Sequence, residues 1–392
     1  MTEHFSFSSL PPLSLYIHIP WCVRKCPYCD FNSHQARGDT IPEQRYVDAL
    51  LQDLTQELPQ VWGRSINTIF FGGGTPSMFS ADAIDRLLCG IRALLPLSGD
   101  IEITLEANPG TTDSGRFIEY RDAGINRLSI GVQSFADHLL ANVGRIHDGR
   151  QAEHAVHAAI NSGIDNINVD LMFGLPHQSV SEAIDDIQTA LSLAPTHISH
   201  YQLTLEPNTL FHASPPQLPD NDLSWEMQHA CTDLLAHAGY AHYEVSAFAR
   251  SNKHCRHNLN YWQYGDYLGI GAGAHGKITN AQSQTITRYW KLKQPAQYLA
   301  NAHSEHRIGG TKQLTPSDTV LEFMMNALRL RNGFDIQLFI QHTGLDQDRL
   351  EASLHTAIKN NWIDYNNNHI RATELGQQFL NDLLTVFVPD DQ

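Results

Sequence analysis

Basic residues are scarce in this chain. Lys and Arg number 26 against 42 Asp and Glu, which gives a formal net charge of −16 with histidine neutral. Proteins that bind nucleic acid through its phosphates present a basic surface. The composition therefore argues against nucleic acid as a partner.

Long apolar stretches are missing as well. No run of residues approaches the roughly 20 apolar positions that span a bilayer, so we expect no membrane span. Residues 1–16 do not contain the charged segment followed by an apolar segment that marks a secretory signal. We therefore expect a cytoplasmic protein.

Cysteine is sparse and unevenly placed. Of six cysteines, Cys22, Cys26 and Cys29 form one C-x3-C-x2-C cluster, and the other three are far apart. This is not a disulfide framework, and in a reducing compartment a tight cluster more often binds metal. The second cysteine pair of a common structural zinc site is absent from the sequence.

Three thiolates leave one position of a metal site open. Thiolates are soft ligands that suit zinc or iron–sulfur clusters. Zinc would need a borrowed ligand such as His34, whereas an iron–sulfur cluster held by three cysteines leaves one iron free for a substrate or cofactor. Spacing alone leaves both alternatives open, together with unliganded thiols; a zinc-stabilised α/β protein without redox chemistry is one possible function class.

The first half of the chain alternates strand patterns with helical patterns. Strands are predicted at 13–19, 66–73, 101–109, 125–133, 167–176 and 197–207, with helical patterns such as 46–58, 81–95 and 180–193 between them. This alternation is typical of βαβ units and a parallel sheet. Six units favour an α/β fold with an open, partial (β/α)6 TIM-like barrel over a closed eightfold one.

Four segments are expected along the chain. They are an N-terminal tail (1–12), the partial barrel (13–210), a linker and barrel-extending region (211–310), and a C-terminal domain (311–392). Proline-rich residues 211–220 indicate the linker. Short helical patterns and a hairpin with an Asn-rich turn at 362–373 predict a small α+β, winged-helix-like C-terminal domain, whose acidity argues against DNA binding.

Unusual residues stand at the carboxyl ends of the predicted strands. The cysteine cluster follows the first strand, "GGGTP" (72–76) the second, "EANP" (106–109) ends the third, "GVQSF" (131–135) ends the fourth, and Asp170 lies on the fifth. Ligands collect at the carboxyl ends of parallel strands in such folds. The five features therefore predict one common site.

The string "CVRKCPYC" after the first predicted strand, followed by "GGGTP" after the second, resembles the radical S-adenosylmethionine (SAM) superfamily. This resemblance implies a [4Fe–4S] cluster on Cys22, Cys26 and Cys29, with the remaining iron chelated by the amino and carboxylate groups of SAM. Glycines allow close backbone approach, and backbone amides can satisfy a carboxylate. The SAM-binding residues it implies are Tyr16, Gly73, Gly74, Thr75, Glu106, Gln133, Arg145 and Asp170.

Longer strings narrow the resemblance. "LYIHIPWCVRKCPYCDFNSH", "EANPG", "RLSIGVQSF", "GRIHD" and "VDLMFGLP", with other matches between 13 and about 276, are similar to oxygen-independent coproporphyrinogen III dehydrogenases and their haem-binding relatives of the HemW type. The dehydrogenases carry a fourth cysteine where this chain has Phe31. HemW-type proteins carry an H-N-x-x-Y-W motif, which is present here as "HNLNYW" (257–262).

The motif implies a haem site. Imidazole is a common ligand of haem iron, and aromatic rings can cover a flat macrocycle. The residues implied are His257, Asn258, Tyr261 and Trp262. His254 and Cys255 are competing ligand candidates beside the motif. Alternatively, His257 caps a turn while the two aromatic residues pack under the glycine-dense stretch 265–276.

The resemblance as a whole implies a haem chaperone. Such a protein would bind the cluster, SAM and haem, and would deliver haem to acceptor proteins, with membrane-associated ones among the candidates. The alternative is an active coproporphyrinogen III dehydrogenase, which performs a radical oxidative decarboxylation. Phe31 and the "HNLNYW" motif favour the chaperone, and no catalytic residue is assigned.

Overall fold

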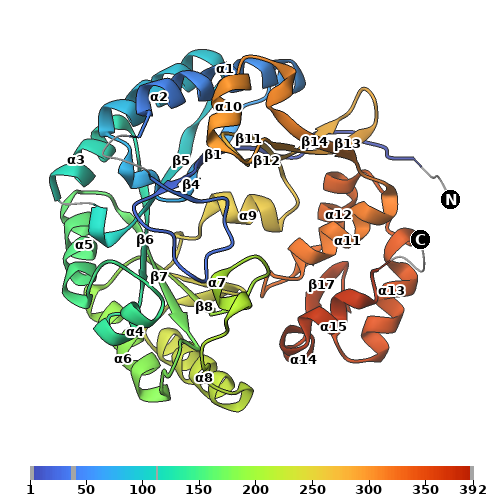
Figure 1. Ribbon diagram of the computed structural model, residues 1–392. Helices are drawn as coiled ribbons and strands as arrows, with labels where there is room; N and C mark the ends of the chain where they lie inside the picture. Colours follow the sequence, from blue (N-terminus) through green and yellow to red (C-terminus); the bar gives the residue numbers. More distant parts are fainter. Residues whose placement is uncertain (1–3, 37–40, 112–113, 389–392) are drawn as a thin grey trace.

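Six parallel strands form the centre of the molecule (Figure 1). The computed structural model describes residues 4–36, 41–111 and 114–388, and its large sheet runs in the order β14-β13-β12-β11-β1-β4-β5-β6-β7-β8-β10-β9. The parallel neighbours are β1 (Leu13–Ile19), β4 (Ile66–Gly73), β5 (Leu97–Ala107), β6 (Arg127–Gln133), β7 (Asn166–Phe173) and β8 (His197–Gln202). The predicted α/β fold with an open, partial barrel is confirmed.

Helices cover the outer side of these strands in Figure 1. They are α1 (Glu43–Val61), α2 (Ala81–Leu94), α3 (Ser114–Ala123), α5 (Gly149–Asn161), α6 (Val180–Leu193) and α8 (Asn221–His237). Buried apolar residues at helical spacing give α2 its inner face, from Ile84 through Leu87 and Leu88 to Ile91. Ser179 and Glu182 form a capping box that starts α6. The helices and strands together enclose the main hydrophobic core.

Predicted boundaries differ from the structure at four of the six strands, including the fourth, which begins at Arg127 rather than 125, and the fifth, which is Asn166–Phe173 rather than 167–176. The third strand begins at Leu97, before the predicted 101, because its first residues already pair with β4 through Ile66. The sixth ends at Gln202 rather than 207, and a turn begins at Pro207, which has no N–H to donate to a sheet. The carboxyl ends of the first, second and fourth strands lie at the predicted residues, and those of the third, fifth and sixth lie two to five residues earlier.

Additional strands extend both edges of the barrel. On the β1 side, β11 (Asp266–Ile270) is parallel to β1, and the antiparallel strands are β12 (His275–Asn280), β13 (Thr285–Lys291) and β14 (Ile308–Gln313). On the β8 side, β10 (Ala247–Ala249) and β9 (Ala241–Glu244) are antiparallel. Shorter elements are β2 (Trp21–Cys22), β3 (His34–Gln35), α4 (Asp137–Asn142), α7 (Leu210–Ala213), α9 (Arg256–Trp262) and α10 (Pro295–Asn301).

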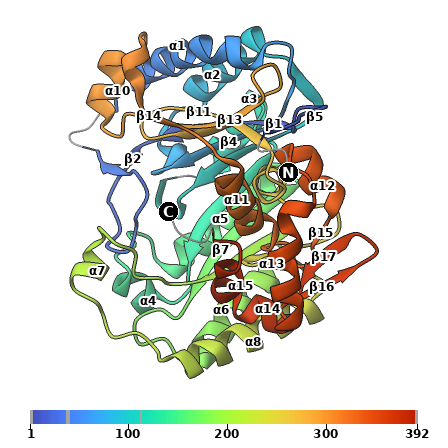
Figure 2. The same cartoon turned by 90° about the vertical axis from the view of Figure 1, so that its right-hand side faces the viewer.

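The C-terminal region has its own core and lies to one side of the barrel in Figure 1, the side that faces the viewer in Figure 2. Its elements are α11 (Pro316–Ala327), β15 (Phe334–Asp335), α12 (Ile336–Thr343), α13 (Asp348–Lys359), β16 (Ile363–Asn366), β17 (His369–Ala372), α14 (Glu374–Gln378) and α15 (Leu380–Thr385). The predicted hairpin is confirmed as β16 and β17, joined by Asn367 and Asn368 at positive φ. Phe5 and Phe7, from the segment expected as an N-terminal tail, are buried in this core.

Candidate functional site

A loop after β1 carries the three clustered cysteines. Pairing of β2 with β3 closes this loop, and the Cys29 N–H donates to the Cys26 carbonyl at 3.2 Å. Cys22 is buried, while Cys26 and Cys29 are half-buried. Burial raises the pKa of the Cys22 and Cys29 thiols. The local fold thus gathers three soft ligands at the carboxyl end of the first barrel strand.

The cysteines line a cavity of about 310 Å³, called here the cysteine cavity. Its wall includes seven of the eight residues predicted for SAM, namely Gly73, Gly74, Thr75, Glu106, Gln133, Arg145 and Asp170. Thiolate donors beside glycine backbone and buried charged groups fit a thiolate-ligated cluster with a bound amino acid moiety. Within the described ranges, no group of three His, Cys, Asp or Glu side chains is placed to hold a single metal ion.

Two glycines after β4 let the backbone approach the cysteine loop. Gly73 has φ of +119°, and a Cβ there would lie 2.7 Å from the His18 ring. At Gly74 a Cβ would lie 2.5 Å from the Trp21 carbonyl oxygen and 3.0 Å from Cys22 Sγ. Side chains are excluded at both positions because contacts this short do not occur. Within "GGGTP", glycine is therefore required at positions 73 and 74 by geometry.

Two carboxyl groups face the cysteine cavity from β5 and β7, the strands on either side of β6. Burial, with Asp170 nearby, raises the pKa of Glu106 to about 8, and its Oε2 accepts from the Gly73 N–H at 3.2 Å. Asp170 accepts from Ser129 Oγ at 3.0 Å and from Asn168 Nδ2 at 2.8 Å. Burial also raises the pKa of Asp170. The cavity therefore holds carboxyl groups in a poorly solvated setting, as functional sites often do.

Buried arginines supply the opposite charge. Arg145 donates to the Gly131 carbonyl oxygen at 2.5 Å and lies 3.7 Å from Cys26 Sγ. Arg127 is buried at the start of β6 and lines the same cavity. The Nε atoms of both arginines are buried, and neither has a hydrogen-bond partner among the residues that the structure describes. Unpaired buried donors of this kind are expensive, which suits a cavity that receives an anionic ligand.

Arg127 and Tyr201 are among the residues of this cavity that the sequence did not predict. The sequence gives a weak signal for Arg127, because it is a charged residue at the start of an apolar strand. Tyr201 gives no sequence signal, and its hydroxyl donates to Gln133 Oε1 at 2.8 Å. Both side chains enter the cavity because β6 and β8 flank β7 in the sheet. Strand order, which spacing does not give, brings them to the site.

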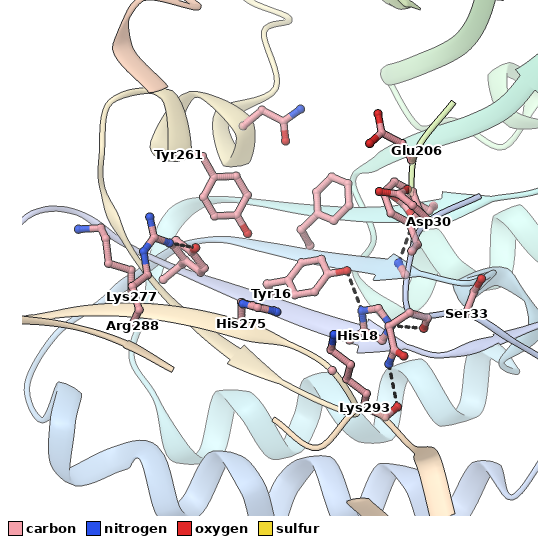
Figure 3. A pocket seen from close by; sticks show the side chains of 18 of the residues that line it. Tyr16, His18, Asp30, Ser33, Glu206, Tyr261, His275, Lys277, Arg288 and Lys293 are labelled. Carbon is pink, nitrogen blue, oxygen red and sulfur yellow. Dashed lines mark hydrogen bonds between the residues drawn. The ribbon is translucent and has the colours of Figure 1, made fainter. Parts of the chain in front are cut away.

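A larger cavity of about 1,020 Å³ adjoins the cysteine cavity, and we call it the aromatic cavity (Figure 3). Tyr16, the eighth predicted SAM residue, lies here beside Phe70, with ring centroids 6.4 Å apart. Lysine and arginine side chains that line it are Lys25, Lys277, Arg288 and Lys293. The two cavities share the wall residues Phe31, Ser33, Phe70, Gly73, Glu106 and Asn258. They are adjacent chambers of one site.

The "HNLNYW" motif forms α9 beside these cavities. Asn258, Tyr261 and Trp262 line the aromatic cavity, and His257 does not. The N–H groups of Arg256 and His257 donate to the Glu102 carboxylate at 3.2 and 3.0 Å. These bonds attach the start of α9 to β5, the strand that carries Glu106.

The His257 ring is buried and fully hydrogen-bonded. Thr68 donates its hydroxyl hydrogen to Ser14 Oγ at 2.8 Å, so His257 Nδ1–H is the donor in the 2.7 Å bond to Thr68 Oγ1. Nε2 then accepts from the Tyr261 hydroxyl at 2.9 Å. Burial lowers the pKa of His257 to about 3. Its lone pair is thus occupied within the protein.

The competing ligand candidates beside the motif lie outside both cavities. Cys255 is buried with Sγ 3.9 Å from Glu102 Oε1, and burial raises its pKa to about 12. The His254 ring packs on Tyr243, with centroids 4.3 Å apart. His34, the borrowed ligand of the zinc alternative, lines the aromatic cavity and its Nε2 hydrogen-bonds Asn32 Oδ1 at 3.2 Å.

The fold and the cysteine site define a class of protein. Residues 16–190 match the family model described as the radical SAM superfamily, and residues 314–379 match the HemN C-terminal domain. The structure of Escherichia coli coproporphyrinogen III oxidase (HemN), described as a radical SAM enzyme, is similar with a TM-score of 0.81 and 24% identity, covering 96% of this chain and 90% of that chain. The chain is a radical SAM protein of this fold.

Curated relatives give the family within that class. A protein of Escherichia coli K12 named heme chaperone HemW is 47% identical over 97% of this chain and 99% of its own length. A Haemophilus influenzae protein of the same name is 48% identical over 97% and 99%, and one from Bacillus subtilis is 34% identical over 87% and 89%. The chain belongs to the HemW family.

Proposed function

We propose that this protein is a haem chaperone that holds a [4Fe–4S] cluster and SAM in the cysteine cavity and haem in the aromatic cavity, and that delivers the haem to acceptor proteins. The observation that carries the proposal is the shared wall between a cysteine-lined cavity and a large aromatic cavity that the "HNLNYW" motif borders. The relatives named heme chaperone HemW support it.

The cluster would be held by Cys22, Cys26 and Cys29. When bound to SAM, such a cluster supplies one-electron reduction of the sulfonium group, a chemistry that a chaperone need not use. Gly73, Gly74 and Thr75 would hold the methionyl end through main-chain and hydroxyl contacts, since all three residues line the cavity. The remaining residues proposed for SAM are Tyr16, Glu106, Gln133, Arg145 and Asp170.

Haem suits the aromatic cavity in size and chemistry. The volume of about 1,020 Å³ is at the upper end of the roughly 300–1,000 Å³ range of ligand sites. Tyr16, Phe70 and Tyr261 offer ring faces and edges to a flat macrocycle, and basic side chains can match two propionate carboxylates. Acceptors would be haem proteins, membrane-associated ones included. Among described residues, no helix is long and apolar enough to cross a membrane.

Reconstitution tests the cluster. Anaerobic incubation with iron and sulfide should load the purified protein and give a broad absorbance at about 400 nm, and Cys22→Ser should lose iron. Cys89→Ser is the matched control because Cys89 is an exposed free cysteine on α2, outside both cavities. Uptake of zinc with no uptake of iron would contradict the proposal.

A product assay separates the chaperone from the dehydrogenase. The reconstituted protein would be incubated anaerobically with coproporphyrinogen III, SAM and a reductant, and we expect no protoporphyrinogen IX. In parallel, the haem-loaded protein should transfer haem to apomyoglobin, a convenient acceptor, faster than it releases haem into solution. Formation of protoporphyrinogen IX would end the chaperone proposal in favour of the dehydrogenase.

A further inference from the structure

One residue of the cysteine cavity has a strained backbone. Gln133 ends β6 with φ of +73°, in the left-handed region that a residue other than glycine enters at a cost in free energy. The pairing of β6 with β7 shifts register between Gly131 and Gln133, so that two residues of β6 span one of β7. An extra residue in a strand re-aims a side chain, and such bulges often border functional sites. The strain is therefore part of how Gln133 reaches the cavity that it lines.

The side chain of Gln133 is fixed inside this cavity. Its Oε1 accepts from the Tyr201 hydroxyl at 2.8 Å. Its Nε2 packs over Gly131, since a Cβ at that glycine would lie 3.0 Å from this nitrogen and 3.4 Å from Arg145 Nη2. The amide thus lies beside the buried Arg145 guanidinium, and a different backbone conformation at Gln133 would remove it from this place.

Hydrogen bonds hold the chain on both sides of Gln133. Before it, His147 Nε2 donates to the carbonyl oxygen of the preceding residue at 3.0 Å. After it, Asp186 of α6 accepts from the Phe135 N–H at 2.6 Å and from the Ser134 hydroxyl at 2.8 and 3.0 Å. A strained residue persists only where its surroundings fix it. The Asp186 carboxyl group provides most of the hydrogen bonds that do so.

Asp186 accepts these bonds as a buried carboxylate. Burial, with the Asp185 and Glu182 charges on the same helix, raises the pKa of Asp186 to about 6, while the hydrogen bonds from Phe135 and Ser134 act in the lowering direction. The group is therefore ionised at pH 7. An ionised carboxylate only accepts hydrogen bonds, so both of its oxygens are available to the turn.

We infer that Asp186 is a positioning residue for SAM binding, because it holds the turn that keeps the Gln133 amide in the cysteine cavity. This rests on the proposed function, since it assumes that the cavity takes SAM. Asp186 itself lines neither cavity. Its effect passes through Ser134 and Phe135 to the strained residue before them.

Binding of SAM to the reconstituted, full-length protein tests this role. Radiolabelled SAM is measured by anaerobic equilibrium dialysis, and iron content is measured in the same samples. Asp186→Asn has nearly the same volume but replaces one acceptor oxygen by an NH2 group. It should raise the Kd for SAM at least about fivefold, the lower end of what the strain at such a residue corresponds to, and should leave iron content unchanged. Asp185→Asn, at its exposed neighbour on α6, is the matched control and should keep both values.

A double-mutant cycle tests whether the effect passes through Gln133. Glycine adopts positive φ without strain, so Gln133→Gly no longer needs Asp186 to hold its backbone. Gln133→Gly alone should weaken SAM binding because the amide is lost, and adding Asp186→Asn should then leave the Kd unchanged. A residue that only stabilised the fold would give additive effects. Gln133→Asn, which also tolerates positive φ and keeps an amide, serves for the same comparison where the glycine variant binds too weakly to measure.

The outcomes separate this inference from the proposed function. If wild type with its cluster loaded binds no SAM, the SAM part of the proposed function and the inference both fail. Equal Kd values for wild type and Asp186→Asn, or additive effects in the cycle, would overturn the role of Asp186 and leave the proposed function standing. Loss of iron from Asp186→Asn would also overturn it, because Gln133 is not a cluster ligand and the damage would then be general.

Discussion

Glu106→Gln should make the ligand-free protein more stable, by an amount that grows with pH. Burial raises the pKa of Glu106 from 4.5 to about 8. A carboxyl whose pKa is raised by folding stays protonated in the folded state, whereas the unfolded chain ionises above 4.5. Stability is therefore unaffected below about pH 4.5, falls between 4.5 and 8, and is constant above that window.

The size of the effect follows from the same shift. Between the two pKa values each pH unit removes about 1.4 kcal/mol from the free energy of unfolding, which amounts to about 3 kcal/mol at pH 7. Glutamine has no such titration and keeps the 3.2 Å acceptor position toward the Gly73 N–H. The variant should gain that amount at pH 7 and nothing at pH 4.5.

Urea unfolding of wild type and Glu106→Gln, measured from pH 5 to 9, checks this prediction. The gap between the two free energies should widen through that range and level off near pH 8. Glu119→Gln, on the exposed face of α3, is the control and should show no such pH-dependent gap. A constant gap, or one that narrows with rising pH, would refute the reasoning. Weaker SAM binding by Glu106→Gln is expected alongside the gain in stability, as in other stability–function trade-offs.

Two further changes probe the scaffold of the site. Gly74→Ala should abolish iron uptake, measured by metal analysis after reconstitution, because its Cβ would lie 2.5 Å from the Trp21 carbonyl oxygen; normal iron content would refute this. Lys291→Met should lower the free energy of unfolding by about 3–5 kcal/mol, since Lys291 Nζ lies 2.6 Å from the buried Asp53 carboxylate. Lys312→Met, at an exposed ion pair, should lower it by about 1 kcal/mol or less, and equal losses in the two variants would contradict this account.

Much of the barrel was predictable because local patterns dominate there. The six central strands are short, apolar and separated by amphipathic helices. Their number and parallel direction therefore follow from the hydrophobic periodicity and from the length of chain between strands. The strands at the two edges of the sheet were harder to predict. Pairing of β11 with β1 joins residues about 250 positions apart, and burial of Phe5 and Phe7 depends on a core formed near the other end of the chain. No local pattern encodes such contacts.

Residues of the candidate site were also predictable where the signal is local and unpredictable where it is not. The three cysteines lie close together in the sequence, and Gly73 and Gly74 are consecutive, so each group carries a strong spacing signal. The hydrogen bonds of His257 do not, because Thr68 is 189 positions away. The motif predicts a role for His257 in haem binding, and its hydrogen bonds to Thr68 and Tyr261 appear only in the folded structure.

The common wall of the two cavities has a thermodynamic consequence. Phe31, Phe70 and Glu106 contact both chambers, so an occupant of either one changes the surroundings of the other. Under the proposed function, any factor by which SAM changes the affinity for haem must equal the factor by which haem changes the affinity for SAM. A loosening of haem by SAM would therefore make haem-free protein the better SAM binder, and the two ligands would report on each other's occupancy through a single coupling constant.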